Sequence, residues 1–125
     1  MTDRRSSNAV YMREDLLWIE VVGDQNGETI RAMGELIDAQ ITILRRAHKP
    51  VLVLDDLTRI GNANTDALKG VAILARMLDY DLAAMLDKKS ALMRGGTNLL
   101  LTSIGRADAR YFSDRDKAMN CLRNG

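Results

Sequence analysis

The sequence has few of the residues that cross-link a small fold, bind metal or break its secondary structure. Among 125 residues it has one cysteine, Cys121, one proline, Pro50, and one histidine, His48. A single cysteine excludes a disulfide within the chain, and without a Cys or His cluster the common zinc frameworks are excluded too. A chain of this length buries roughly 70% of the surface that its unfolded form exposes, so we expect one domain that needs no covalent staple.

Aromatic residues, excess charge and long apolar runs are also scarce. Aromatics make up 4% of the chain, and 18 Lys and Arg against 17 Asp and Glu leave a net charge of +1. This composition offers no base-stacking platform and no long-range attraction to nucleic acid. No apolar run approaches the roughly 20 residues that cross a bilayer, and residues 1–7 have no signal-peptide core. We expect a cytoplasmic protein without nucleic acid, membrane insertion, metal or cofactor.

The stretch VLVLDDLTRIGNANT, residues 51–65, organises the chain. Its apolar run ends in two aspartates, which is typical of a parallel strand buried on both faces, and we expect the central strand at residues 51–55. Asp, Asn and Gly residues then predict a polar elbow from Asp56 to Thr65. Asn62, Asn64 and Thr65 are all suitable caps for an amphipathic helix over residues 66–78. We expect Thr65 to be the N-cap, and a regulated hydroxyl there would be compatible with that capping role.

The remaining chain alternates strand and helix patterns. A flexible tail over residues 1–7 precedes a single domain over residues 8–125, which opens with a hairpin of strands near residues 8–14 and 16–22. We expect a turn at residues 23–27, helices at 28–47, 90–104 and 113–122, with Ser113 opening a capping box, and strands at 82–86 and 108–112. This order predicts an α/β domain with a mixed, mostly parallel sheet and covering helices.

Three segments together resemble the STAS family (sulfate transporter and anti-sigma factor antagonist domains), in its SpoIIAA-like branch. They are VLVLDDLTRIGNANTDALKG, YDLAAMLDKKSALMRGGTNLLLTSI and ADARYFSDRDKAMNCL. The resemblance implies a non-catalytic module that binds a regulatory protein, often one with a kinase-like fold such as an anti-sigma factor, under the control of phosphorylation. Classical members carry the phosphorylated serine in an Asp-Ser-Ser-Gly run. This chain has residues 62–66, NANTD, at that place, which leaves Thr65 as the candidate phosphorylation site.

Open α/β sheets present their variable surface beyond the carboxyl ends of the strands, and the elbow is the most polar and turn-rich such segment of this chain. We therefore predict that the partner docks on the elbow and on the exposed face of the following helix. The predicted partner-binding residues are Asp56, Thr58, Asn62, Asn64, Thr65, Asp66 and Lys69.

Other interpretations of the same residues remain. The pair Asp55-Asp56 is similar to the acidic pair that holds Mg²⁺ in receiver domains, but it lies in mid-chain and only the adjacent Asp87 and Lys88 follow it, which favours turn and cap chemistry. The alternative function is a carrier or sensor of a small apolar ligand, such as a lipid, in a pocket between sheet and helices. A homodimer is also expected, because two-fold dimers are the commonest assembly.

Overall fold

The structure is a computed structural model, and it describes residues 7–86 and 109–124. The strands are β1 (Ala9–Arg13), β2 (Leu16–Gln25), β3 (Leu52–Ala63), β4 (Leu82–Leu86) and β5 (Ala109–Phe112), and the helices are α1 (Gly27–Arg46), α2 (Thr65–Met77) and α4 (Arg115–Asn124). The helix expected over residues 90–104 lies outside the described residues. The other predicted helices and strands are present, with shifts at several boundaries. The turn predicted at residues 23–27 is wrong, because β2 continues to Gln25 and α1 begins at Gly27.

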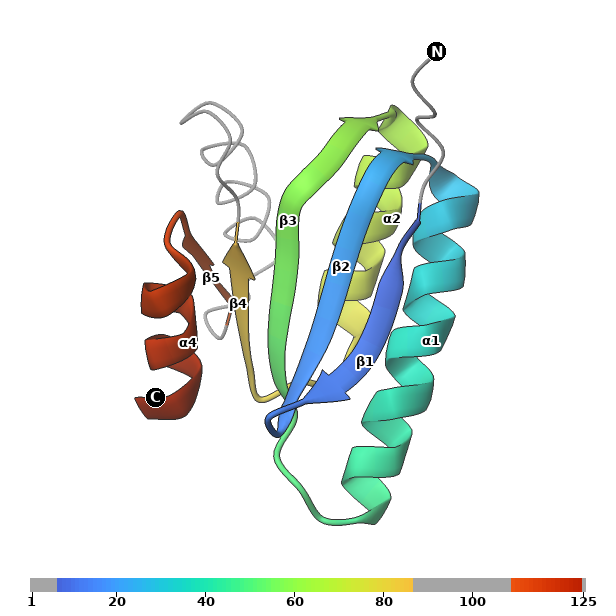
Figure 1. The fold of residues 1–125 in the computed structure, drawn as a ribbon. Helices are drawn as coiled ribbons and strands as arrows, with labels where there is room; N and C mark the ends of the chain where they lie inside the picture. The colour runs from blue at the N-terminus through green and yellow to red at the C-terminus, as the bar shows by residue number, and fades with distance from the viewer. Residues whose placement is uncertain (1–6, 87–108, 125) are drawn as a thin grey trace.

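The five strands form one sheet in the order β1-β2-β3-β4-β5 (Figure 1). β1 pairs antiparallel with β2, whereas β2, β3, β4 and β5 run parallel to one another. The prediction of a mixed, mostly parallel sheet with β3 at its centre is therefore confirmed. The β1–β2 hairpin closes through Glu14 and Asp15, whose φ angles of 55° and 64° allow the tight two-residue turn that matches the twist of the strands.

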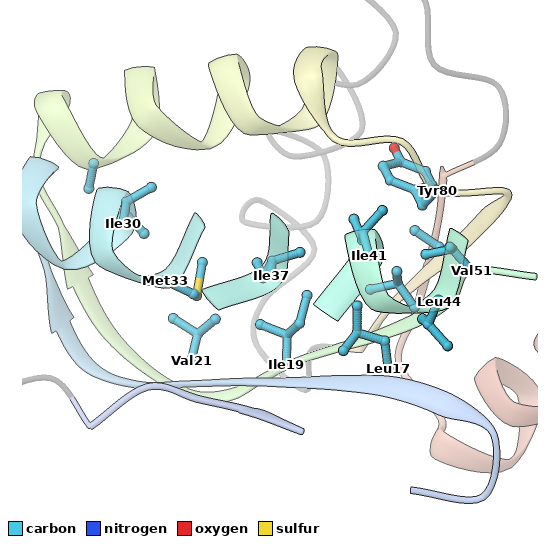
Figure 2. Close-up of a cluster of buried hydrophobic side chains, with 13 residues drawn as sticks. Leu17, Ile19, Val21, Ile30, Met33, Ile37, Ile41, Leu44, Val51 and Tyr80 are labelled. Carbon is cyan, nitrogen blue, oxygen red and sulfur yellow. The ribbon is translucent and has the colours of Figure 1, made fainter. Parts of the chain in front are cut away.

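Helices α1 and α2 cover one face of the sheet and bury the larger core. From β2, Leu17, Ile19 and Val21 point toward this face, and α1 presents an apolar stripe to them at three- and four-residue spacing (Figure 2). The stripe consists of Ile30, Met33, Ile37, Ile41 and Leu44, each no more than 6% exposed. The side chains fill the space between the helix and the sheet.

Helix α4 covers the opposite face over β3, β4 and β5. Ala118 and Leu122 pack there against Leu54, Ala84 and Leu86. The N-cap of this helix is Asp114, whose carboxylate accepts the amide of Asp116 at 2.8 Å, so the predicted capping box opening at Ser113 is wrong by one residue.

The expected elbow is wrong: the chain stays extended to Ala63 as a twelve-residue strand. β3 continues because its parallel partner β2 also continues, to Gln25, and the two remain paired across two register shifts. Leu57 and Ile60 pack on the core, which holds this polar segment against the sheet. At Gly61 a Cβ atom would lie 2.2 Å from Asp24 Oδ1, so the close approach of the two strands requires glycine.

Candidate functional site

Two helix N-termini lie side by side at one end of the sheet, because β2 and β3 are parallel neighbours that end together. Gln25 pairs with Ala63 at the last register position, and α1 and α2 begin directly after these strands. Asn26 caps α1 and accepts the Thr29 amide at 2.9 Å, while Asn64 caps α2 and accepts the Ala67 amide at 2.9 Å. The expectation that Thr65 is the N-cap is therefore wrong; Asn64 has that role, and Thr65 is the first residue of α2.

The Gln25 side chain links β2 by hydrogen bonds to α1 and to Asn8, the residue before β1. The side chain is only 3% exposed, and its amide nitrogen donates to Asn8 Oδ1 at 3.0 Å and to the Gly23 carbonyl at 3.1 Å. Its oxygen accepts from Asn8 Nδ2 at 2.8 Å and from Thr29 Oγ1 at 3.0 Å. The buried amide is thus bonded on both sides, which holds the start of α1 rigidly against β1 and β2.

A groove of about 480 Å³ lies between the first turns of α1 and α2. Its apolar lining comes from Ile30, Ile73 and Leu74. Four charged side chains line it as well, two of each sign: Glu28, Arg31, Asp66 and Lys69. A lining that combines apolar side chains with charges of both signs suits a protein-binding patch and does not favour a single small anion.

The structure brings together only part of the predicted partner-binding set. Asn64, Asp66 and Lys69 line the groove, and Thr65 is exposed beside it. Asn62 is exposed near the end of β3, where its amide donates to Asp24 Oδ1 at 2.8 Å. These five residues form one end surface with the start of α1, which we call the helix-pair end.

Asp56 and Thr58 do not join this surface. Asp56 is 6% exposed and lies on the opposite face of the sheet, where its carboxylate accepts the Thr58 amide at 2.9 Å and the Thr58 hydroxyl at 2.6 Å. Arg115 of α4 approaches the second carboxylate oxygen at 3.6 Å and also lies over the ring of Trp18, 5.9 Å from its centroid. Asp56 therefore fastens α4 to the sheet.

Asp55 behaves differently from its neighbour. It faces α1 and α2, with Ile19 and Met85 at the registered positions on either side. The residue is partly buried, but Oδ1 is fully buried and has no hydrogen-bond partner among residues 7–86 and 109–124. Burial, together with the charge of Asp56, raises the pKa of Asp55 from 3.8 to about 7. This carboxylate does not do the turn and cap chemistry expected of the pair, which only Asp56 performs.

The residues of α1 and its cap that belong to the site were not predicted from the sequence. Asn26, Glu28 and Arg31 lie in a segment whose pattern indicated only a turn followed by an amphipathic helix. A weak signal was present: an Asn precedes both helices, at positions 26 and 64, each after a strand pattern. Only the adjacency of β2 and β3 turns the two caps into one surface.

Within residues 7–86 and 109–124, no group of three or more His, Cys, Asp or Glu side chains could hold a metal ion. Of the three helices described, none combines the length and the hydropathy needed to span a bilayer.

Comparison with known proteins identifies the fold. No family model and no curated protein matches this sequence. Among solved structures, the chain is similar to an uncharacterised protein of the DUF3478 family with a SpoIIAA-like fold from Shewanella loihica PV-4, with a TM-score of 0.67 and 16% identity over 98% of both chains. It is also similar to an anti-sigma factor antagonist from Mycobacterium paratuberculosis, with a TM-score of 0.69 and 17% identity over 98% of this chain and 97% of that one.

These matches span nearly the full length of every chain compared. The chain therefore has the SpoIIAA-like fold of STAS domains, as the three sequence segments predicted. At 16% and 17% identity the likeness concerns the fold. Function is argued from the site.

Proposed function

We propose that this protein is a non-catalytic regulatory module that binds a partner protein through the helix-pair end. The observation that carries the proposal is the groove between α1 and α2, whose lining combines apolar side chains with four charged side chains of balanced sign. The similarity in fold to an anti-sigma factor antagonist supports the same class of function. By that analogy, the partner is a regulatory protein such as a kinase-like anti-sigma factor.

The rigidity of the helix-pair end also supports docking. Both helices begin with side-chain caps, and Gln25 holds α1 to β1 and β2 through bonds on both sides of its amide. A surface that is ordered before binding loses little conformational entropy when a partner arrives. The backbone around the groove is therefore suited to repeated, reversible docking.

Thr65 is the proposed point of control. It is exposed, it opens α2, and it lies between two groove residues along the chain, Asn64 and Asp66. A phosphate at a helix N-terminus is favoured by the helix dipole, so the fold tolerates it, while up to two added charges change the surface that the partner meets. Phosphorylation of Thr65 would in this way alter binding without unfolding the domain.

The alternative function, a carrier of a small apolar ligand, has less support. The space between the sheet and α1 is filled by large side chains that meet one another (Figure 2). The groove between α1 and α2 opens on the outside of the helices and carries charge. Native mass spectrometry of the purified protein separates the two functions: a co-purifying ligand of a few hundred daltons would favour the carrier.

The docking proposal is tested by affinity capture followed by direct titration. Three proteins are immobilised: the parent, Lys69→Glu and the control Lys117→Glu, which makes the same charge change at an exposed position of α4. The proteins that each of them retains are compared, and each retained protein is then purified and titrated against all three. We expect a protein that binds the parent and Lys117→Glu equally and Lys69→Glu at least tenfold more weakly. Equal affinity for all three would place docking elsewhere on the domain.

A further inference from the structure

Among the described strands, β1 forms an edge of the sheet and has β2 as its single neighbour. β1 is the outermost strand of the described sheet, and its sequence, AVYMR, contains no proline or lysine and pairs with β2 without a register shift. The Ser7 amide donates to the Val22 carbonyl at 2.9 Å, so odd-numbered residues bond to β2. Val10 and Met12 therefore turn their amide and carbonyl groups outward, which is the condition in which strand edges pair with another chain.

An exposed apolar stripe runs along α1 beside this edge. Ala32, Leu36, Ala39 and Ile43 recur at spacings of four, three and four, and all are exposed, Leu36 by 53% and Ile43 by 59%. Ala32 and Leu36 line a groove with Ser7 and Asn8, which places this stripe on the β1 side of the helix. Helix α1 thus has a second apolar stripe besides the one that it buries in the core.

We propose that the β1 edge and this α1 stripe form a two-fold interface with a second copy of the same chain. In the interface, Val10 pairs antiparallel with Met12 of the second copy, so that the two sheets become one continuous sheet. The outward groups of Val10 and Met12 are then bonded in both copies, and Leu36 of each helix meets Ile43 of the other. The inference is independent of the partner at the helix-pair end.

A single two-fold axis satisfies both features. α1 runs in the same direction as β1 (Figure 1), and Ser7 and Asn8 are level with the turn of α1 around Ala32. Tyr11, the centre of β1, lies about 12 Å further along the strand, a distance that α1 covers in about eight residues. The centre of β1 is therefore level with Ala39 and Gln40, midway between Leu36 and Ile43.

Spacing and charge agree with this axis. Strands are about 4.8 Å apart, so helices that lie over β1 and β2 in each copy are about 10 Å apart across the axis, close to ordinary helix packing.

Glu35 and Arg46 are exposed on one flank of the stripe, about three turns apart. In an antiparallel pair centred between Leu36 and Ile43, Glu35 of one copy is level with Leu44 of the other and about 3 Å along the helix axis from Arg46, within reach of that long side chain. This charge complementarity favours a second copy as the occupant.

The test measures the mass of the purified full chain by light scattering after gel filtration, over a range of concentrations. We expect the parent to have twice the 13.9 kDa of one chain. The double variant Leu36→Glu/Ile43→Glu should be monomeric, whereas the control Leu68→Glu on α2, at a residue 53% exposed like Leu36, should remain a dimer. Met12→Pro, which removes an outward amide and leaves the bonds to β2, should weaken the dimer at least tenfold.

A charge exchange checks the register. Glu35→Arg and Arg46→Glu should each weaken the dimer, and the two together should restore it, with circular dichroism confirming that every variant is folded. A parent that is monomeric at all concentrations would overturn the proposal. It would also be overturned by a Leu36→Glu/Ile43→Glu variant that dimerises like Leu68→Glu, or by a charge exchange that restores nothing.

Discussion

Replacing Asp55 by asparagine should stabilise the domain near neutral pH and change how its stability depends on pH. Asp55 lies on the central strand between Ile19 and Met85, with a buried oxygen that has no hydrogen-bond partner in the part of the chain that the structure describes. Burial and the neighbouring charge of Asp56 raise its pKa from 3.8 to about 7. The ionised form is thus less favourable in the folded protein than in the unfolded chain, where water solvates it.

The sign and size of the effect follow from the two pKa values. Well below pH 3.8 the carboxyl is neutral in both states and does not affect the free energy of unfolding. As pH rises toward 7 the unfolded chain ionises first, which lowers the free energy of unfolding. Above pH 7 the full penalty applies, about 4 kcal/mol for this difference in pKa. Because the residue as a whole is only partly buried, this figure is an upper limit.

Urea unfolding at pH 5 and pH 8 measures the effect. The penalty is about 2 kcal/mol at pH 5 and about 4 kcal/mol at pH 8, so the parent should lose up to about 2 kcal/mol relative to Asp55→Asn over this interval. That loss corresponds to a relative shift of about 1 M or more in the urea midpoint. Asp38→Asn, at an exposed position of α1, is the control and should follow the parent. Equal pH dependence in the parent and Asp55→Asn would refute the reasoning.

Three further changes test the packing and the caps, each by urea unfolding. Leu54→Ala should cost about 2–5 kcal/mol, because Leu54 is fully buried beneath α4, and a loss below 1 kcal/mol would contradict that placement. Gly34→Ala adds about 1 kcal/mol of helix propensity but places a Cβ 2.5 Å from Leu74 Cδ2, so it should be close to neutral in the parent, whereas with Leu74→Ala, which removes the clash, the same change should stabilise by about 1 kcal/mol. Asn64→Ala should cost about 1 kcal/mol and Asn64→Asp much less, since aspartate also caps α2; equal losses would argue against the cap.

Strong periodic patterns and clear end signals were enough to predict most elements. The spacing from Ile30 to Leu44 predicted α1 to within one residue at each end, and residues 82–86 were predicted with their observed bounds. Pro50 explains the end of α1, because the residues before a proline avoid helical geometry; the chain leaves the helix at His48 with a φ of 55°.

The extension of β3 could not be predicted, because its cause is a distant partner. Residues 56–63 contain Asp, Gly and Asn, which locally favour a turn, but pairing with the end of β2 and packing of Leu57 and Ile60 hold them extended. The part of the site that belongs to α1 could not be predicted for the same reason. Asn64, Asp66 and Lys69 follow the organising strand in sequence, whereas Glu28 and Arg31 reach the groove only through the pairing of β2 with β3.

The central claim, that the helix-pair end is a docking surface open to control at Thr65, is tested most directly by Thr65→Glu. The melting temperature and the affinity for the captured partner are measured on the same sample, with Thr42→Glu, an equal charge change at an exposed position toward the C-terminal end of α1, as control. A negative charge at the first residue of α2 suits the helix dipole, so stability should be kept while affinity falls at least tenfold, and Thr42→Glu should bind like the parent. Unchanged affinity in a folded Thr65→Glu variant would contradict the claim.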